Sequence, residues 1–356
     1  MSNTIYVHTL GDSTLDNLYW MLSEGDNLET AKNKSVEGQL KTHLGDGFEV
    51  ISHAYDGFTT SSVLQGATVG EVLPGKNGTA YERYISEKII SSSGLNAHPL
   101  KKLLKNTTEA PTAKHYVVIS VGGNDFREHL ANPLKLLTIT ADVQKRYLEI
   151  VDQVKKLGTH VQPILMFQYR ISTANQGYGI YTILGRLGRV AAAVNTTCVA
   201  ALGYLGWQLA RGKISPVFGI AGCAIAAIVL ALSARTLPLK VTLGILKGQN
   251  PGITVIGALM EKLYQPILKY AEKEKLPILD LPNSFNPYQK NLYLHEIEPS
   301  EKGGALIAQG LANIIKNRNE ASSTIYRCDG KTSTNVPEKW AVEYPSKPKS
   351  DHGKSK

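Results

Sequence analysis

Short apolar runs alternate along the chain with longer amphipathic stretches. Five of the runs are rich in Val, Ile and Leu and are bounded by glycine or polar residues, which is the pattern of buried strands. They cover residues 4–11, 48–57, 115–125, 162–170 and 276–285. Four stretches have helical spacing, at residues 28–44, 141–157, 258–274 and 300–318. The alternation predicts an α/β fold, in which a parallel sheet carries helices on both faces.

One region departs from this pattern. Residues 190–210 and 216–234 are apolar and contain no charged side chain, and each is close to the roughly 20 residues that span a bilayer. Both are dense in Gly, Ala, Ser, Thr and Cys, which is typical of membrane helices, whereas a soluble core uses larger side chains. The region predicts a transmembrane helical hairpin. A pair of buried helices in a large soluble core is the alternative.

Basic residues are distributed unevenly around this hairpin. Arg211 and Lys213 lie in the link between the two apolar segments, and five more flank the segments: Arg186, Arg189, Arg235, Lys240 and Lys247. Because cytoplasmic flanks carry the excess of Lys and Arg, this bias predicts a multi-pass membrane protein whose main domain lies on the cytoplasmic side.

The hairpin therefore interrupts a larger domain. We expect residues 1–176 to form the first part of that domain, 177–248 to form the inserted hairpin with its flanks, and 249–319 to form the second part. The remaining residues, 320–356, are rich in Ser, Thr, Lys and Pro and are predicted to be poorly ordered.

Composition narrows the partners. The formal net charge is +9, but the lysines are not interleaved with aromatic residues, so we predict no nucleic-acid partner, while an anionic membrane surface would suit this charge. Cys198, Cys223 and Cys328 are too few and too widely spaced for a metal site or a disulfide framework, which favours a reducing compartment. No glycine pattern has the context of a nucleotide-binding loop, so no cofactor is expected.

Polar residues follow three of the predicted strands. The first strand ends in Gly11, Asp12 and Ser13, Gly57 follows the second, and Asn124 follows the third. Since the carboxyl ends of parallel strands meet at one edge of a sheet, these residues are expected to converge. A serine hydroxyl beside two backbone amides and an asparagine amide is the equipment of an acyl-transfer nucleophile and its oxyanion hole.

These blocks resemble the SGNH, or GDSL, hydrolase superfamily. Its first three blocks match GDS at Ser13, the glycine at Gly57 and GxND at Asn124, and the similarity covers residues 4–175 and 250–318. The resemblance implies a flavodoxin-like, three-layer α/β/α fold with a five-stranded parallel sheet. It also implies hydrolysis of an ester, thioester or similar acyl bond without a metal.

The last block departs from the family. Members usually end in Asp-x-x-His, with the histidine as general base, whereas here His295 occupies the aspartate position and Glu298 the histidine position. Pro299 holds Glu298 extended, which works against a simple shift of register. A glutamate with an ordinary pKa near 4.3 is a poor base toward a serine hydroxyl.

Two functions remain open after this departure. The first is a membrane-anchored serine hydrolase that acts on an acyl ester. The second is a catalytically silent SGNH fold that serves as a membrane-tethered binding module. Because the insertion follows the fourth strand, it should leave the sheet at the catalytic edge, which favours a lipid or lipidated substrate. Residues expected to line the approach are Tyr178, Tyr181, Leu184 and Leu187. Of the polar residues nearby, we expect Asp12 to anchor the nucleophile turn, Asp125 to brace its loop and His53 to be structural.

Overall fold

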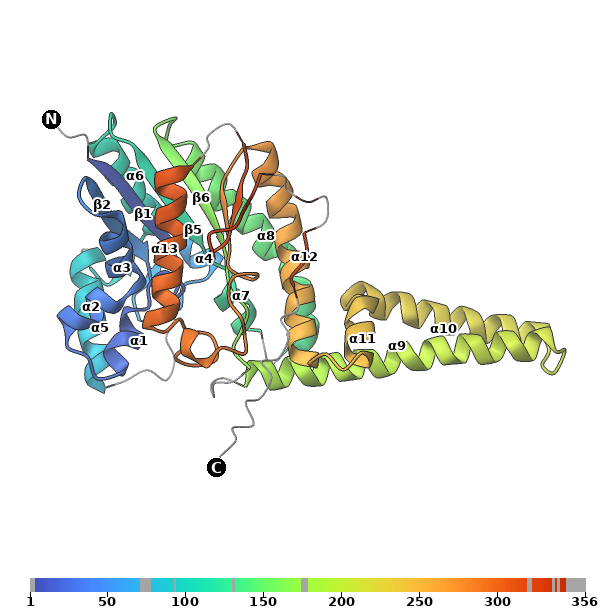
Figure 1. Ribbon diagram of the computed structural model, residues 1–356. Helices are drawn as coiled ribbons and strands as arrows, with labels where there is room; N and C mark the ends of the chain where they lie inside the picture. The colour runs from blue at the N-terminus through green and yellow to red at the C-terminus, as the bar shows by residue number, and fades with distance from the viewer. Residues whose placement is uncertain are drawn as a thin grey trace, which may run out of the picture. The chain divides into compact units, whose positions relative to one another are not determined.

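The computed structural model describes residues 4–70, 78–92, 94–129, 132–173, 179–318, 322–334, 337 and 340–343. The chain forms two compact units (Figure 1). The sheet unit comprises Met1–Tyr178 and Lys262–Lys356, and the hairpin unit comprises Gly179–Glu261. The hairpin unit is longer than the predicted insertion of residues 177–248, because it includes the first turns of the helix that leads back into the sheet unit.

A mostly parallel sheet of seven strands organises the sheet unit. Its strands, in spatial order, are β2 (Phe48–Ala54), β1 (Ile5–Gly11), β5 (His115–Ser120), β6 (Val161–Phe167), β7 (Ile278–Asp280), β8 (Ile325–Tyr326) and β9 (Thr332–Ser333). All neighbours pair in parallel except β8 and β9. The five predicted strands are present, but the sheet is wider than the five strands that the family resemblance implies.

The two additional strands come from the segment that was predicted to be poorly ordered. Ile325 and Tyr326 are buried, and they pair with Ile278 and Leu279 of β7. Composition misled the prediction here, because a few apolar residues in a polar segment are sufficient to extend an existing sheet edge. The backbone groups of that edge supply the hydrogen bonds.

Helices cover both faces of the sheet. The helices of the sheet unit are α1 (Leu18–Ser23), α2 (Leu28–Lys34), α3 (Val36–Leu44), α4 (Thr60–Gln65), α5 (Gly78–Ser92), α6 (Pro99–Glu109), α7 (Gly123–Arg127), α8 (Pro133–Lys155), α12 (Pro251–Lys273, which begins in the hairpin unit) and α13 (Glu301–Asn317). A 3-10 turn, Lys290–Leu292, and a small antiparallel pair, β3 (Ala67–Thr68) with β4 (Asn96–Ala97), complete it. The predicted helix 28–44 is divided at Ser35, whose extended backbone ends α2 and whose side chain caps α3 by accepting from Gly38 N–H.

The core lies against alternate residues of each strand. Val7, Val50 and Val118 face α3 and α13, which pack on this side of the sheet in front of the strands (Figure 1). The period of two along a strand sends the intervening residues, such as His8 and His53, to the opposite face. The carboxyl ends of β1, β2 and β5 therefore lie side by side at one edge.

Three histidines on that opposite face form a hydrogen-bonded ladder across β2, β1 and β5. His8 Nδ1 lies 3.1 Å from His53 Nε2, and His8 Nε2 lies 2.9 Å from His115 Nδ1. His115 Nε2 lies 2.9 Å from the carbonyl oxygen of Ala110, which can only accept. The carbonyl therefore sets the direction of the whole ladder: all three neutral rings donate from Nε2, and His8 and His115 accept at Nδ1.

The hairpin unit contains two helices that are long and apolar enough to span a bilayer. They are α9 (Ile180–Ala210) and α10 (Pro216–Thr236), and they run side by side in Figure 1. In their most apolar windows only 17% and 11% of residues are buried, which is the opposite of what a pair of soluble core helices would show. This exposure suggests membrane association.

Close packing holds the hairpin unit together. A Cβ added to Gly219 or Gly222 of α10 would meet a leucine methyl of α9 at 2.9 Å, so small residues bring the two helices together. The short helix α11 (Leu239–Leu246) packs on α9, where Asn195 Nδ2 donates to Thr242 Oγ1 at 2.8 Å. Tyr181, Leu184 and Leu187 lie near the start of α9, and Tyr178 lies outside the described residues.

Candidate active site

Ser13 lies in a tight turn directly after β1. The turn is held to the end of β5 by Asp12 N–H, which donates to the carbonyl of Ser120 at 3.2 Å, and is closed by Leu15 and Asp16 N–H groups that donate to the carbonyl of Asp12. Only 7% of Ser13 is exposed. Neither its backbone N–H nor its hydroxyl forms a hydrogen bond with any part of the chain that the structure describes.

Gly57 lies at the same edge, in the turn that follows β2. Its φ of 86° is in the left-handed region, where a residue without a Cβ is favoured. Among the described residues, its N–H also has no hydrogen-bond acceptor. The turns after β1 and β2 thus each present one uncommitted backbone donor.

Asn124 is the second residue of the short helix α7, which follows β5. One N–H of its side-chain amide donates to the carbonyl of Phe58 at 3.0 Å, which ties it to the residue after Gly57. The neighbouring Asp125 accepts from Thr60 N–H at 2.9 Å and from Arg146 at 3.0 Å, so it braces α7 against α4 and α8 as expected. Three adjacent strands therefore bring Ser13, Gly57 and Asn124 to one edge.

A buried ion pair sets the Ser13 turn against the Gly57 turn. Asp16 Oδ2 accepts from Lys88 Nζ at 3.0 Å, from the Tyr84 hydroxyl at 2.9 Å and from Asp56 N–H at 3.0 Å. Burial works against the Lys88 ammonium, but the charges of Asp16 and Glu37 and the hydrogen bond to Asp16 together outweigh it, and the pKa of Lys88 is raised. The pair was not anticipated, because Asp16 and Lys88 are 72 positions apart (88 minus 16) and only the fold brings α5 to this turn.

Asp12 and Gln168 make a second support for the same turn. Asp12 Oδ1 accepts from Thr14 N–H at 3.1 Å, as predicted, and Oδ2 accepts from Gln168 Nε2 at 2.5 Å. Burial raises the pKa of Asp12 to about 7 against the lowering effect of these hydrogen bonds. Gln168 is itself held by Tyr264, whose hydroxyl accepts from Gln168 N–H at 2.9 Å. The residue after β6 thus positions the residue before Ser13.

The segment around Glu298 packs against the Ser13 turn. Ile297 accepts from the Tyr169 hydroxyl at 2.8 Å, and Pro299 accepts from Asn17 Nδ2 at 3.3 Å. Glu298 lies between these two anchored residues and is fully buried. Burial raises the pKa of Tyr169, and the Glu298 carboxylate raises it further.

His295 is held elsewhere in this segment. Its ring packs edge-on against Trp20 of α1, with 5.0 Å between ring centroids, and it is partly exposed. Glu298 therefore lies between two residues that are connected to the Ser13 turn. Pro299 contacts Asn17 directly, and Ile297 contacts Tyr169, which in turn contacts Thr14. Among the described residues, no group of three His, Cys, Asp or Glu side chains is arranged to hold a metal ion.

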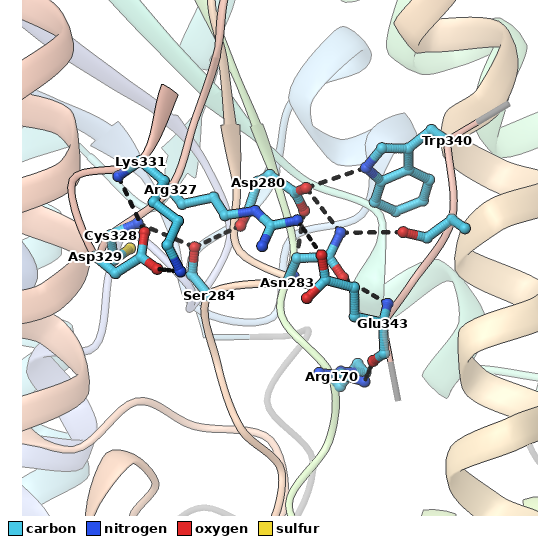
Figure 2. Close-up of polar contacts among 11 residues, drawn as sticks. Arg170, Asp280, Asn283, Ser284, Arg327, Cys328, Asp329, Lys331, Trp340 and Glu343 are labelled. Atoms are coloured by element: carbon cyan, nitrogen blue, oxygen red, sulfur yellow. Dashed lines mark hydrogen bonds and ion pairs between the residues drawn. The ribbon is translucent and has the colours of Figure 1, made fainter. Parts of the chain in front are cut away.

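The C-terminal strap, residues 340–343, lies beside Asp280 and Asn283 at the end of β7 (Figure 2). Asp280 at the end of β7 accepts from Trp340 Nε1 at 3.0 Å and from Asn283 Nδ2 at 2.8 Å. Glu343 N–H donates to Asn283 Oδ1 at 2.7 Å, and Arg170 donates to the Glu343 carbonyl at 2.5 Å. Trp340 also packs on Tyr264, the residue that accepts a hydrogen bond from Gln168 N–H.

Comparisons with known proteins add little to this picture. No family model matches the sequence, and no curated protein matches it. A crystal structure with 16% sequence identity aligns to 48% of this chain with a TM-score of 0.29, and the chain spans 65% of that protein's length. A likeness this low carries no argument about fold or activity, so the functional assignment depends on the site itself.

Proposed function

We propose that this protein is a membrane-anchored SGNH-type serine hydrolase. It cleaves an ester or another acyl bond through a Ser13 acyl-enzyme, and its substrate is a lipid or a lipidated molecule. The proposal joins three features described above: the Ser13 turn, the donors around it and the apolar hairpin.

The observation that carries the proposal is the set of uncommitted donors. A buried N–H without an acceptor is rare in folded proteins, because it costs about 1–3 kcal/mol. Ser13 and Gly57 each present such an N–H among the described residues, and Asn124 keeps one of its two amide protons uncommitted. Donors left without acceptors where three strands end are what an oxyanion hole requires before substrate arrives.

The strand order supports the same assignment. Numbered by their order in the chain, the five long parallel strands β2, β1, β5, β6 and β7 read 2-1-3-4-5 across the sheet. This is the order of flavodoxin-like folds, in which functional residues lie beyond the carboxyl ends of the strands. Ser13, Gly57 and Asn124 follow the three strands on one side of that sheet.

The proposed reaction starts with attack of Ser13 Oγ on the acyl carbonyl carbon. Glu298 accepts the hydroxyl proton, and the N–H groups of Ser13, Gly57 and Asn124 stabilise the negative charge that develops on the carbonyl oxygen. The alcohol leaves with a proton, and water then releases the acyl group from Ser13. A carboxylate becomes an effective base toward a hydroxyl only when it is removed from water, and the burial of Glu298 meets that condition.

The hairpin supports the membrane part of the proposal. Of the 18 large hydrophobic residues that are exposed in the described chain, 15 belong to the hairpin unit. Apolar surface of this extent is costly in water and is covered at no cost by lipid chains. With five basic flanking residues against two in the link, the sheet unit lies on the cytoplasmic side and the hairpin crosses twice.

A fluorophosphonate probe tests the chemistry, because it labels an activated serine and not an idle one. We expect the purified protein to be labelled, Ser13→Ala to abolish labelling, and Ser23→Ala, an exposed serine at the end of α1, to leave it unchanged. Circular dichroism of each variant establishes that the fold is retained. Absence of labelling in the folded wild-type protein would remove the hydrolase proposal.

That negative result would favour the second function, a silent SGNH fold that acts as a membrane-tethered binding module. The observation on its side is the closed site: Ser13 is almost entirely buried, and Glu298 completely so. The two functions share the fold and the anchor, and they differ only in whether Ser13 reacts.

A further inference from the structure

An aromatic and basic cluster forms the hairpin tip, residues 204–213. Tyr204 and Trp207 are exposed near the end of α9, and their rings lie 6.3 Å apart. The Arg211 guanidinium lies 4.4 Å from the centre of the Trp207 ring, and Lys213 Nζ lies 5.7 Å from it. Two exposed cations therefore share one indole at the end of the hairpin.

The backbone of the turn produces this arrangement. Arg211 N–H donates to the carbonyl of Trp207, and Lys213 N–H donates to the carbonyl of Gln208, both within α9. Gly212 adopts a φ of 64°, which reverses the chain between the two cations. Arg211 and Lys213 consequently both lie next to the Trp207 ring.

The charge around the tip has one sign. Between residues 179 and 260 the sequence contains seven Lys and Arg residues and no Asp or Glu. The two cations at the tip repel each other. The only acidic residue in the sequence of the hairpin unit is Glu261, its last residue, which is 48 positions after Lys213 (261 minus 213). An anion placed between Arg211 and Lys213 would offset this repulsion.

The neighbouring surface determines which anion fits. The tip lies where the exposed apolar surface ends, with Val199 on α9 and Val217, Phe218 and Ile220 on α10 beside it. Tyrosine and tryptophan are the residues that occupy the level of lipid headgroups. A ligand that matches both parts has a phosphate for the cations and acyl chains for the helices.

From this match we infer that the hairpin tip binds the phosphate of anionic phospholipids. The inference rests on the proposed membrane anchor and adds the lipid class that the anchor selects. Arg211 binds the phosphate through paired N–H donors, and Lys213 adds a second positive charge. Both cations pack on the Trp207 ring, which lies among the upper acyl carbons. The hairpin is then an anchor with a preferred lipid.

Tryptophan quenching by brominated lipids tests the inference on the full-length protein in nanodiscs. Trp207 is 45% exposed, whereas Trp20 and Trp340 are 7% and 3% exposed within the sheet unit, so quenching reports on lipid next to Trp207. Phosphatidylcholine nanodiscs receive a small mole fraction of either brominated phosphatidylglycerol or brominated phosphatidylcholine. Two cations are expected to enrich the anionic lipid roughly 30-fold, so the brominated phosphatidylglycerol should quench far more strongly.

Two double variants make the test specific. Arg211→Gln with Lys213→Gln should equalise the two lipids, whereas Lys269→Gln with Lys273→Gln, which removes the same charge from exposed positions of α12 in the sheet unit, should preserve the preference. Trp207→Phe should remove the quenching and so identify its source. Equal quenching by both lipids in the wild-type protein, or a preference that survives the tip variant, would overturn the inference. Failure of the protein to enter nanodiscs would overturn the membrane anchor itself.

Discussion

Glu298 is the residue on which the proposed chemistry depends most. Under the proposed function it stands where the histidine of SGNH hydrolases would reach the nucleophile. It is buried, and the residues on both sides of it are tied to Tyr169 and Asn17. His295, three positions earlier, packs on Trp20. The side chains of Glu298 and His295 therefore lie in different surroundings: Glu298 is buried, and His295 packs on Trp20 and is partly exposed.

We expect Glu298→Gln to lower ester turnover by about 10²- to 10⁴-fold, because the amide cannot accept the Ser13 proton. His295→Gln should have a much smaller effect, since it removes a ring contact and no proton acceptor. The measurement is kcat on a short-chain ester for both variants, with circular dichroism to establish folding. A larger loss in His295→Gln would mean that this histidine is the base and that the last block closes differently on substrate.

The histidine ladder makes stability depend on pH. Burial lowers the pKa of His8 to about 3, with His115 adding to the effect, and burial likewise lowers the pKa of His53. In the unfolded chain these rings take up protons below about 6.5, whereas in the folded protein they stay neutral. The unfolded state therefore binds more protons below pH 6.5, and stability falls as the pH drops from 6.5 toward 3.

For His8 alone, each unit below pH 6.5 should lower the free energy of unfolding by about 1.4 kcal/mol. Between pH 6.5 and 5 this amounts to roughly 2 kcal/mol. In His8→Gln this contribution is absent, so the gap in stability between the wild-type protein and the variant should narrow by that amount. Urea unfolding in detergent at the two pH values measures it. A gap that is independent of pH would show that His8 is already charged in the folded protein.

Two elements extend the sheet unit beyond what its family resemblance implies. One is the C-terminal addition of β8, β9 and the strap, which closes over Asp280 and packs Trp340 on Tyr264. The other is the hairpin, which adds apolar surface and basic ends without a single acidic residue before Glu261. The strap acts within the sheet unit, whereas the hairpin forms a unit of its own.

Replacement of residues 190–234 by a short Gly and Ser linker should separate these roles. The shortened protein should be soluble without detergent and should keep its activity on a small soluble ester, since Ser13, Gly57, Asn124 and Glu298 all lie in the sheet unit. Activity on esters presented in vesicles should fall by an order of magnitude or more, because the acyl chains are no longer held close to the enzyme. Assays on the two substrates, with vesicle flotation, give the answer. Equal losses on both substrates, or flotation that survives the replacement, would contradict the proposed anchor.

At the scale of the whole molecule, the two units differ in whether their large hydrophobic side chains are buried or exposed. The sheet unit buries its apolar residues against a sheet, and only Ile90, Leu95 and Leu104 among its large hydrophobics are exposed in the described residues. Between residues 190 and 234 the hairpin exposes large hydrophobic residues and buries small or polar ones such as Gly219 and Asn195. This inversion is expected when one part of a chain packs in water and another packs in lipid.

Much of this organisation is local in the chain and could be predicted from the sequence. The five main strands, the α/β alternation and the two apolar helices each depend on spacing within a short window, because the periods of strands and helices repeat over a few residues. The Ser13 turn, Gly57 and Asn124 could be located in the same way, since each directly follows an apolar run. Their shared edge followed from parallel pairing alone.

Tertiary structure decided the contacts between segments that are far apart in the sequence. Asp16 meets Lys88, Asp12 meets Gln168, and His8 meets His53 and His115 only because the strands and helices that carry them pack together. Ile325 and Tyr326 became a strand because β7 offered an open edge, although their own neighbourhood is polar. Sequence determined the elements and the Ser13 turn through short-range spacing. Packing decided the supports of that turn and the width of the sheet, because those contacts form between residues that no local pattern relates.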